Sequence, residues 1–157
     1  MRLSQNFTLS ELCKSQTAER KGLLNLPDTD QIEALEKLCA YILQPIRDEF
    51  GSFIVSSGFR SPELCVAIGS KITSQHTANN GAAAADFEVA GHDNYELCKW
   101  IEANLPFDQL ILECYNGEPN SGWVHCSYSD EGRRETLTYS KSKGYRQIVT
   151  ALEAQGR

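Results

Sequence analysis

The sequence predicts an α+β fold, in which a small antiparallel sheet packs against N-terminal helices. Helical patterns gather in the first half of the chain and strand patterns in the second, which disfavours a doubly wound parallel sheet. A length of 157 residues with 41% hydrophobic content suits one compact core. We therefore expect a single domain over residues 1–157, with its core at about 4–130 and a C-terminal extension at 131–157.

Two helical signals open the chain. Thr8-Leu9-Ser10-Glu11 has the form of a capping box, which predicts a short helix. A longer amphipathic helix should end at Gly51, and Pro45 inside it predicts a kink or two abutting helices. Its apolar stripe recurs at spacings of three and four: Ile32, Leu35, Leu38, Ile42, Ile46 and Phe50.

A strand, a turn and a short helix follow. Phe53-Ile54-Val55-Ser56 is apolar and β-branched, and it runs into the glycine-containing turn Ser57-Gly58-Phe59-Arg60. Ser61 before Pro62 is typical of a helix start, so we expect a short helix that reaches about Ile68.

The second half reads as strands around one helix. A helix is expected over 94–104, and strands are expected over 84–89, 107–113 and 123–128. Weaker patterns predict an edge strand at 135–140 and a C-terminal helix at 145–154. The polar stretch 71–81 is expected to be irregular.

Composition limits the classes of partner. The net charge of −6 opposes binding to nucleic acid, so we expect no such partner. No segment approaches the roughly 20 apolar residues that span a bilayer, and the N-terminus lacks a secretion signal. We expect a monomer that is made in the cytoplasm without a signal peptide.

The six cysteines do not indicate a disulfide framework. None forms a Cys-x-x-Cys pair, which also removes the strongest signal for structural zinc or redox chemistry. We interpret them as reduced residues, mostly in the core: Cys13, Cys39, Cys65, Cys98, Cys114 and Cys126.

Two histidines and one aspartate stand out as candidate metal ligands. His76 ends a loop, His125 lies inside a strand, and Asp86 sits at the centre of an apolar strand, where a carboxylate is costly unless it is paired. Two imidazoles and a carboxylate can hold zinc with a position left for water. Residue types alone leave the alternatives open, since a strand histidine can be a packed core residue and an aspartate can cap a turn.

Four ordered motifs give the chain a resemblance to a known family, the zinc D-alanyl-D-alanine carboxypeptidases and L-alanyl-D-glutamate endopeptidases, which include phage endolysins. The resemblance covers roughly residues 4 to 130. It implies one Zn²⁺ per chain held by His76, Asp86 and His125 on the sheet, and Arg60 in contact with a peptidoglycan peptide. The motifs are Ser57-Gly58-Phe59-Arg60-Ser61, then Ser74-Gln75-His76 with Gly81 and Ala84-Ala85-Asp86-Phe87, then Phe107-Asp108-Gln109-Leu110-Ile111-Leu112-Glu113, then Trp123-Val124-His125-Cys126-Ser127-Tyr128.

The sequence departs from this family in two places. The usual pattern His-x-x-Gly-x-Ala-x-Asp separates its ligands by seven positions, whereas His76 and Asp86 are ten apart. Some members place a glutamate base three residues before the last histidine, where this chain has Gly122. We therefore predict Glu113 as the catalytic base, with Glu118 as a weaker candidate and an ordinary strand-end carboxylate as the alternative for Glu113.

Further residues are expected around the metal. Strand alternation puts Trp123 and Ser127 on the side of His125, with Trp123 as a wall of the cleft and Cys126 facing away. Ser74 is expected to steady His76 by a hydrogen bond.

The resemblance, together with the candidate ligands, implies zinc-dependent hydrolysis of stem peptides in the cell wall, by an endolysin-like endopeptidase or a carboxypeptidase. Phage-type release would bring such an enzyme to its substrate. The alternative is a catalytically inactive, zinc-containing module that binds the cell wall. A thiol-based redox protein is a third reading, for which the cysteine spacing offers no reactive pair.

Overall fold

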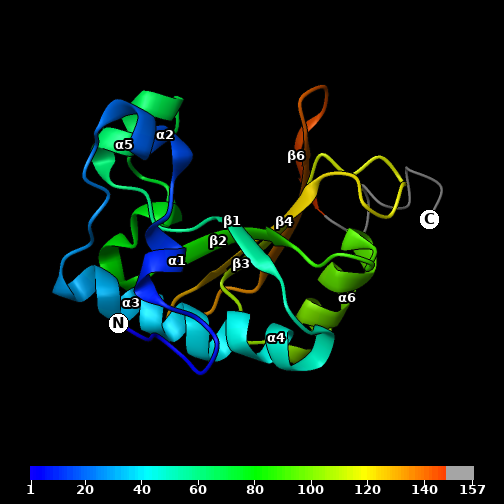
Figure 1. Ribbon diagram of the computed structural model, residues 1–157. Helices are drawn as coiled ribbons and strands as arrows, with labels where there is room; N and C mark the ends of the chain where they lie inside the picture. Colours follow the sequence, from blue (N-terminus) through cyan, green and yellow to red (C-terminus); the bar gives the residue numbers. More distant parts are fainter. Residues whose placement is uncertain (148–157) are drawn as a thin grey trace.

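Helices cover one face of a six-stranded sheet in the computed structural model, which describes residues 1–147 (Figure 1). This arrangement confirms the expected α+β class. The α-helices are α1 (Leu9–Cys13), α2 (Gln16–Lys21), α3 (Thr29–Leu38), α4 (Gln44–Phe50), α5 (Pro62–Ile68) and α6 (Asn94–Asn104). The strands are β1 (Ile54–Ser57), β2 (Ala83–Glu88), β3 (Gln109–Glu113), β4 (Trp123–Tyr128), β5 (Glu135–Ser140) and β6 (Gly144–Gln147).

The long N-terminal helix is interrupted where proline predicts a break. A π-helical turn, η1 (Cys39–Leu43), joins α3 to α4, and the amide of Gln44 donates to the carbonyl of Cys39. Pro45 has no amide hydrogen to offer the preceding turn, and a wider turn just before it absorbs that mismatch. The apolar stripe nevertheless continues, so Leu35, Leu38, Ile42 and Ile46 are all buried.

The strands follow the order β1-β2-β4-β3-β5-β6, and β3 with β5 is the parallel pair among otherwise antiparallel neighbours. Strand β5 comes after β4 in the chain but pairs with the far side of β3, so it runs in the direction of β3. The predicted strand at 135–140 is confirmed, but its expected place at the edge of the sheet is wrong, because β6 pairs with the outer side of β5. The helix predicted at 145–154 is wrong for Tyr145–Gln147, because pairing with β5 makes these residues a strand, and the remainder lies outside the described residues.

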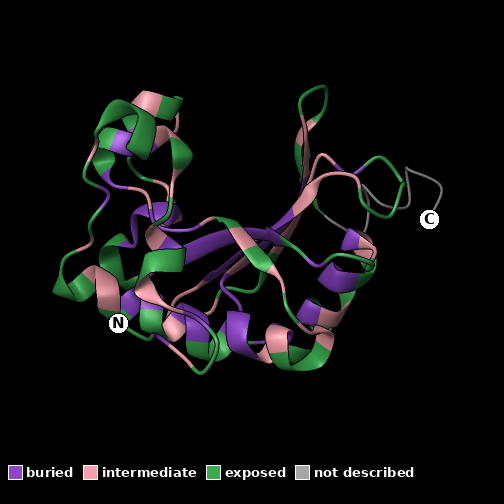
Figure 2. Ribbon diagram, viewed as in Figure 1, coloured by how far each residue is buried: buried purple, intermediate pink, exposed green. Residues whose placement is uncertain are grey.

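The core lies between the sheet and the helices, and it appears as the buried band in Figure 2. Alternation directs one set of strand residues toward α3, η1 and α6. That set includes Ala85, Phe87, Leu110, Leu112, Val124 and Cys126. The helical residues that pack against this set are Leu35, Leu38, Ile42, Leu97 and Ile101. The other set of strand residues, which contains the predicted ligands Asp86 and His125, therefore faces away from the helical layer.

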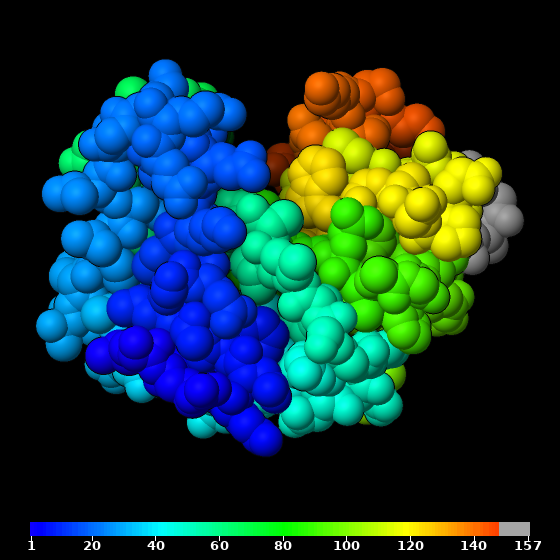
Figure 3. All heavy atoms as spheres, viewed as in Figure 1, coloured from blue at the N-terminus to red at the C-terminus, as the bar shows by residue number. Residues whose placement is uncertain are grey.

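The face opposite the helices is bordered on two sides. Helices α2 and α5 rise at one end and the β5–β6 hairpin rises at the other (Figure 1). Figure 3 shows the molecule hollowed between these two projections. Within the described part of the chain, no helix is long and apolar enough to cross a membrane.

All six cysteines are free, and four of them are buried. Burial raises the pKa of the Cys13 thiol to about 11 and that of Cys39 to about 12. Such thiols are not reactive nucleophiles, in agreement with their interpretation as reduced, structural residues.

Candidate metal centre

Asp86 and His125 are direct cross-strand partners on β2 and β4. Their side chains lie on the face away from the helices, and Nδ1 of His125 is 2.9 Å from Oδ1 of Asp86. His76 comes from a separate 3-10 turn, η2 (Gln75–Thr77), and its Nε2 is 3.3 Å from the same oxygen. The structure thus brings together three side chains that are far apart in the sequence, and all three are buried.

The orientation of His76 is fixed by the backbone around it. Its Nδ1 donates a 2.7 Å hydrogen bond to the carbonyl oxygen of Gly58, which leaves Nε2 on the side of Asp86. The amide of Arg60 also donates to the carbonyl of His76 at 2.8 Å. The turn after β1 therefore holds both the ring and the main chain of this residue.

Gly58 must be glycine for this contact to form. A Cβ at this position would lie 2.3 Å from the carbonyl oxygen of Leu12, in helix α1. The adjacent amide of Phe59 donates to that same Leu12 oxygen at 2.6 Å. The close approach of α1 thereby sets the position of the turn that orients His76.

The lengthened loop between the first two ligands is coiled rather than extended. Ala78, Asn80 and Gly81 all adopt left-handed conformations with φ of 55°, 58° and 75°. Nε2 of Gln31, on α3, donates to the carbonyl of Thr77 at 3.1 Å and to Oδ1 of Asn79 at 3.0 Å. The extra residues are taken up against α3, and the separation of His76 from Asp86 stays short.

The charge on Asp86 is stabilised despite its burial. Burial acts to raise the pKa of this carboxyl, but hydrogen bonding with His125 and His76 outweighs it and holds the pKa well below its usual range. Nη2 of Arg60 adds a positive charge 3.4 Å from Oδ2. Asp86 is therefore an ionised carboxylate in a buried setting, as a metal ligand must be.

The donor set fits a zinc ion. One atom from each of the three residues can be chosen so that all lie within 4.8 Å of one another. Tetrahedral zinc with bonds of about 2.0–2.1 Å separates its ligand atoms by roughly 3.3 Å, close to the two short distances around Asp86. Imidazole nitrogens and a carboxylate oxygen are also ligands that zinc prefers. These three residues could hold the metal with a fourth position left free.

Glu113 lies on the same face, one row of residues along the sheet from His125. It pairs with Trp123 across β3 and β4, and the indole Nε1 of Trp123 donates a 2.8 Å hydrogen bond to its Oε2. Burial raises the pKa of Glu113, and the negative charge of Asp86 raises it further. A half-buried carboxyl of raised pKa beside a metal site has the properties of a general base or acid.

Position 122 cannot carry the glutamate found in some relatives of the resembled family. Gly122 has φ of +64°, and a Cβ there would lie 1.9 Å from the carbonyl oxygen of Glu113. The chain crosses β3 too closely at this point for any side chain. The structure thus gives a steric reason for the departure seen in the sequence.

The other predicted residues occupy distinct surroundings. Arg60 donates to Ser57 at 3.0 Å and to Ser70 at 3.3 Å, so its guanidinium is held beside Asp86. Ser74 accepts from the backbone amide of His76 at 3.2 Å rather than contacting the ring. Ser127 faces the same side as His125, but its Oγ accepts from the amide of Gln109 at 3.0 Å. Glu118 is exposed in the β3–β4 loop.

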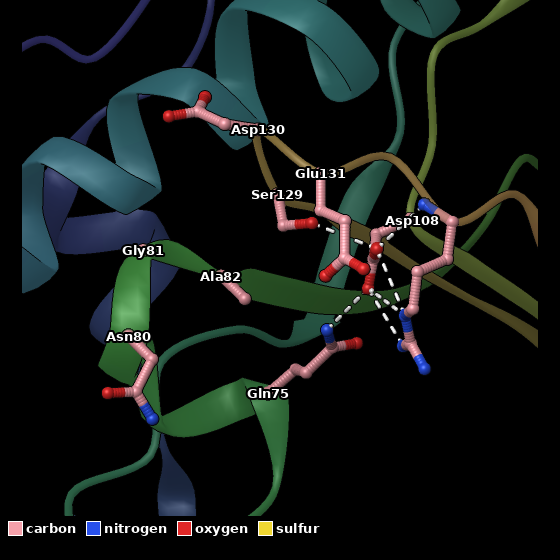
Figure 4. A pocket seen from close by; sticks show the side chains of 9 residues that line it. Gln75, Asn80, Gly81, Ala82, Asp108, Ser129, Asp130 and Glu131 are labelled. Atoms are coloured by element: carbon pink, nitrogen blue, oxygen red, sulfur yellow. Dashed lines mark hydrogen bonds and ion pairs between the residues drawn. The ribbon is translucent and has the colours of Figure 1, made fainter.

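Sequence reasoning assigned no role to Asp108 and Gln75, which support the loop that carries His76. Both residues line a cavity of about 380 Å³. Figure 4 shows the side chains of Gln75 and Ser129 pointing toward Asp108. Nε2 of Gln75 donates to Asp108 at 2.7 Å, and Nη2 of Arg133 donates to it at 2.8 Å. The only signals were the positions of Gln75 directly before a ligand and Asp108 directly before a strand.

A sheet that presents a buried His–Asp–His cluster beside a carboxyl of raised pKa has the arrangement that metal-dependent hydrolases use. The family model of peptidase M15 matches residues 5–127, and the chain belongs to this family. Membership makes the chain a metallopeptidase and supports action on peptidoglycan in general. No curated protein matched the sequence.

Proposed function

We propose that the protein hydrolyses peptide bonds in peptidoglycan stem peptides with one zinc ion held by His76, Asp86 and His125. The observation that carries the proposal is the convergence of these three ligands in a chain of the peptidase M15 family. A lysis enzyme that reaches the cell wall by phage-type release would use this activity.

Zinc would supply Lewis acidity to the scissile carbonyl and to the attacking water. Glu113 takes the proton from that water and returns it to the departing amine, a role that its raised pKa suits. Trp123 holds the carboxyl in place through its indole hydrogen bond.

Arg60 acts on the substrate rather than on the proton. Its guanidinium is fixed by Ser57, Ser70 and Asp86, and it also lines the groove between β1, α2 and α5. A planar cation held at the edge of such a groove can bind a substrate carboxylate or the scissile carbonyl oxygen.

Digestion of purified peptidoglycan, with and without a chelator, tests the activity. We expect new amino groups to appear with the zinc-loaded protein, to disappear with chelator, and to return when zinc is restored. The Asp86→Ala variant should lose both zinc and activity, while wild type binds zinc near stoichiometry. Asp130→Ala is the control, since Asp130 lies in the loop after β4 and its exposed side chain pairs with Lys37 on α3 rather than with a proposed ligand.

An inactive wall-binding module is the second candidate, and the observation that favours it is Gly122, where relatives of the resembled family can place a base. That candidate predicts a protein that carries zinc and sediments with peptidoglycan but releases no amino groups. Release of amino groups that Asp86→Ala abolishes would exclude it.

A further inference from the structure

The β5–β6 hairpin extends the metal-bearing sheet beyond the residues that match the family. The match ends at residue 127, whereas β5 and β6 span Glu135–Ser140 and Gly144–Gln147. Strand β5 pairs with β3 on the side away from β4. The hairpin therefore adds two strands next to the one that carries Glu113.

Strand register places two tyrosines of this hairpin on the same face as the ligands. Tyr139 pairs with Glu113 across β3 and β5, and Tyr145 pairs with Tyr139 across β5 and β6. Paired residues of neighbouring strands point to the same side of a sheet. Trp123, Glu113, Tyr139 and Tyr145 thus form one lateral row, adjacent to the row that contains Asp86 and His125.

The two tyrosines form a surface that faces the hollow. Their rings lie 4.7 Å apart at 48°, and Tyr145 is 61% exposed. Burial raises the pKa of Tyr145, and the charges of Glu113, Tyr139 and Asp86 raise it further. An exposed ring backed by a second ring is suited to contact a flat or apolar part of a ligand.

The surface continues in both directions from the metal ligands. Strands β4 and β6 are three strand spacings apart, a distance of about 14 Å. A bound peptide in extended conformation would cover that distance with about four residues. On the other side, a groove of about 500 Å³ lies between β1, α2 and α5 and is lined by Ser57, Arg60 and Ile54 among others. Figure 3 shows the hollow bounded by both projections.

We infer that Tyr145, supported by Tyr139, binds the substrate peptide on the Glu113 side of the scissile bond. This inference rests on the proposed function. The site accordingly takes a peptide that continues past the scissile bond on both sides, with Arg60 near one end and the tyrosines near the other. The extra strands make this contact a property of the present chain rather than of the matched region.

Binding measurements on the zinc-loaded protein test the role of Tyr145 separately from catalysis. In the Glu113→Gln background, calorimetry would give the Kd of a stem tetrapeptide and of its two dipeptide halves. We expect Tyr145→Ala to weaken tetrapeptide binding roughly three- to tenfold and to leave at least one dipeptide half unaffected. Tyr145→Phe should bind nearly as well as the parent, because the ring provides the contact.

Arg146→Ala is the matched control, because Arg146 is exposed on the same strand and pairs with Thr138 on the opposite face. It should leave every Kd unchanged. Equal tetrapeptide affinity in the parent and in Tyr145→Ala would overturn the inference, as would an equal loss for Arg146→Ala. If wild type cleaves no peptidoglycan, the proposed activity fails, while the Kd comparison still decides whether Tyr145 binds the peptide.

Discussion

The Nδ1 nitrogen of His76 lies 2.7 Å from the carbonyl oxygen of Gly58, in the turn that follows strand β1. A carbonyl oxygen can only accept, so Nδ1 carries the hydrogen and Nε2 is available to a metal. Helix α1 holds this turn in place, because the backbone amide of Phe59 donates a hydrogen bond to the carbonyl oxygen of Leu12. The N-terminal helix therefore helps to position a proposed metal ligand without offering one itself.

Gly58→Ala should weaken zinc binding about ten- to hundredfold, the usual effect of losing a hydrogen bond that orients a ligand. The added methyl group would lie 2.3 Å from the Leu12 oxygen and displace the carbonyl that His76 requires. Competition with a chromogenic chelator measures the change. Gly91→Ala is the control, since its φ of +82° brings strain but no atom lies within 4 Å of the new Cβ. Unchanged zinc affinity in Gly58→Ala would refute this role of the turn.

Glu113→Gln should lower kcat by about 10²- to 10⁴-fold while zinc content remains at the wild-type level. The amide keeps the size and the contact with Trp123 but cannot accept a proton from water. Steady-state hydrolysis of a stem peptide, with metal analysis of the same samples, separates the two effects. Glu118→Gln should match wild type, and the reverse pattern would make Glu118 the base.

The sequence predicted the proximity of His76, Asp86 and His125 better than it predicted the sheet. Alternation with period two placed Trp123, His125 and Ser127 on one face, because side-chain direction in a strand is a local property. The pairing of β5 with β3 is not local, and nothing between residues 129 and 134 indicates which edge the chain will join. For the same reason local patterns predict a helix at Tyr145, whereas cross-strand pairing holds it in β6.

Local sequence patterns also cannot predict contacts between residues that are far apart in the chain. The steric demand on Gly122 arises from the backbone of Glu113 and Cys114, which reaches it only when β3 and β4 are paired. Likewise the role of Asp108 depends on Arg133, a residue 25 positions away. Such demands appear in the sequence as an unexplained glycine or an unexplained charge.

Gly122→Ala should destabilise the fold by at least about 2 kcal/mol, because the left-handed backbone and the 1.9 Å approach to Glu113 act together. Urea unfolding of the metal-free protein gives the free energy of unfolding. Gly117→Ala supplies the comparison, since its φ is +100° and its Cβ would meet open space. Equal losses in the two variants would mean that strain alone, and not the close approach of β3, acts at position 122.

Asp108 links the loop before His76 to the segment between β4 and β5. Its carboxylate accepts hydrogen bonds from Gln75, Ser129 and Arg133 (Figure 4). Burial acts to raise the pKa of Asp108, but the bonds from Arg133, Gln75 and Ser129 outweigh burial and hold that pKa well below its usual range. The carboxylate form is therefore favoured by folding.

Asp108→Asn should lower the free energy of unfolding by about 2 kcal/mol at neutral pH, the cost of losing hydrogen bonds to a buried charge. A folded pKa below the unfolded value of about 3.9 means that this stabilisation is complete above about pH 4 and is lost as the pH falls through the folded pKa. The difference between wild type and Asp108→Asn should accordingly shrink in acid. Urea unfolding of metal-free samples across this range measures it. Asp130→Asn should change stability little at any pH, because its ion pair with Lys37 is solvent-exposed, and a pH-independent deficit in Asp108→Asn would contradict the argument.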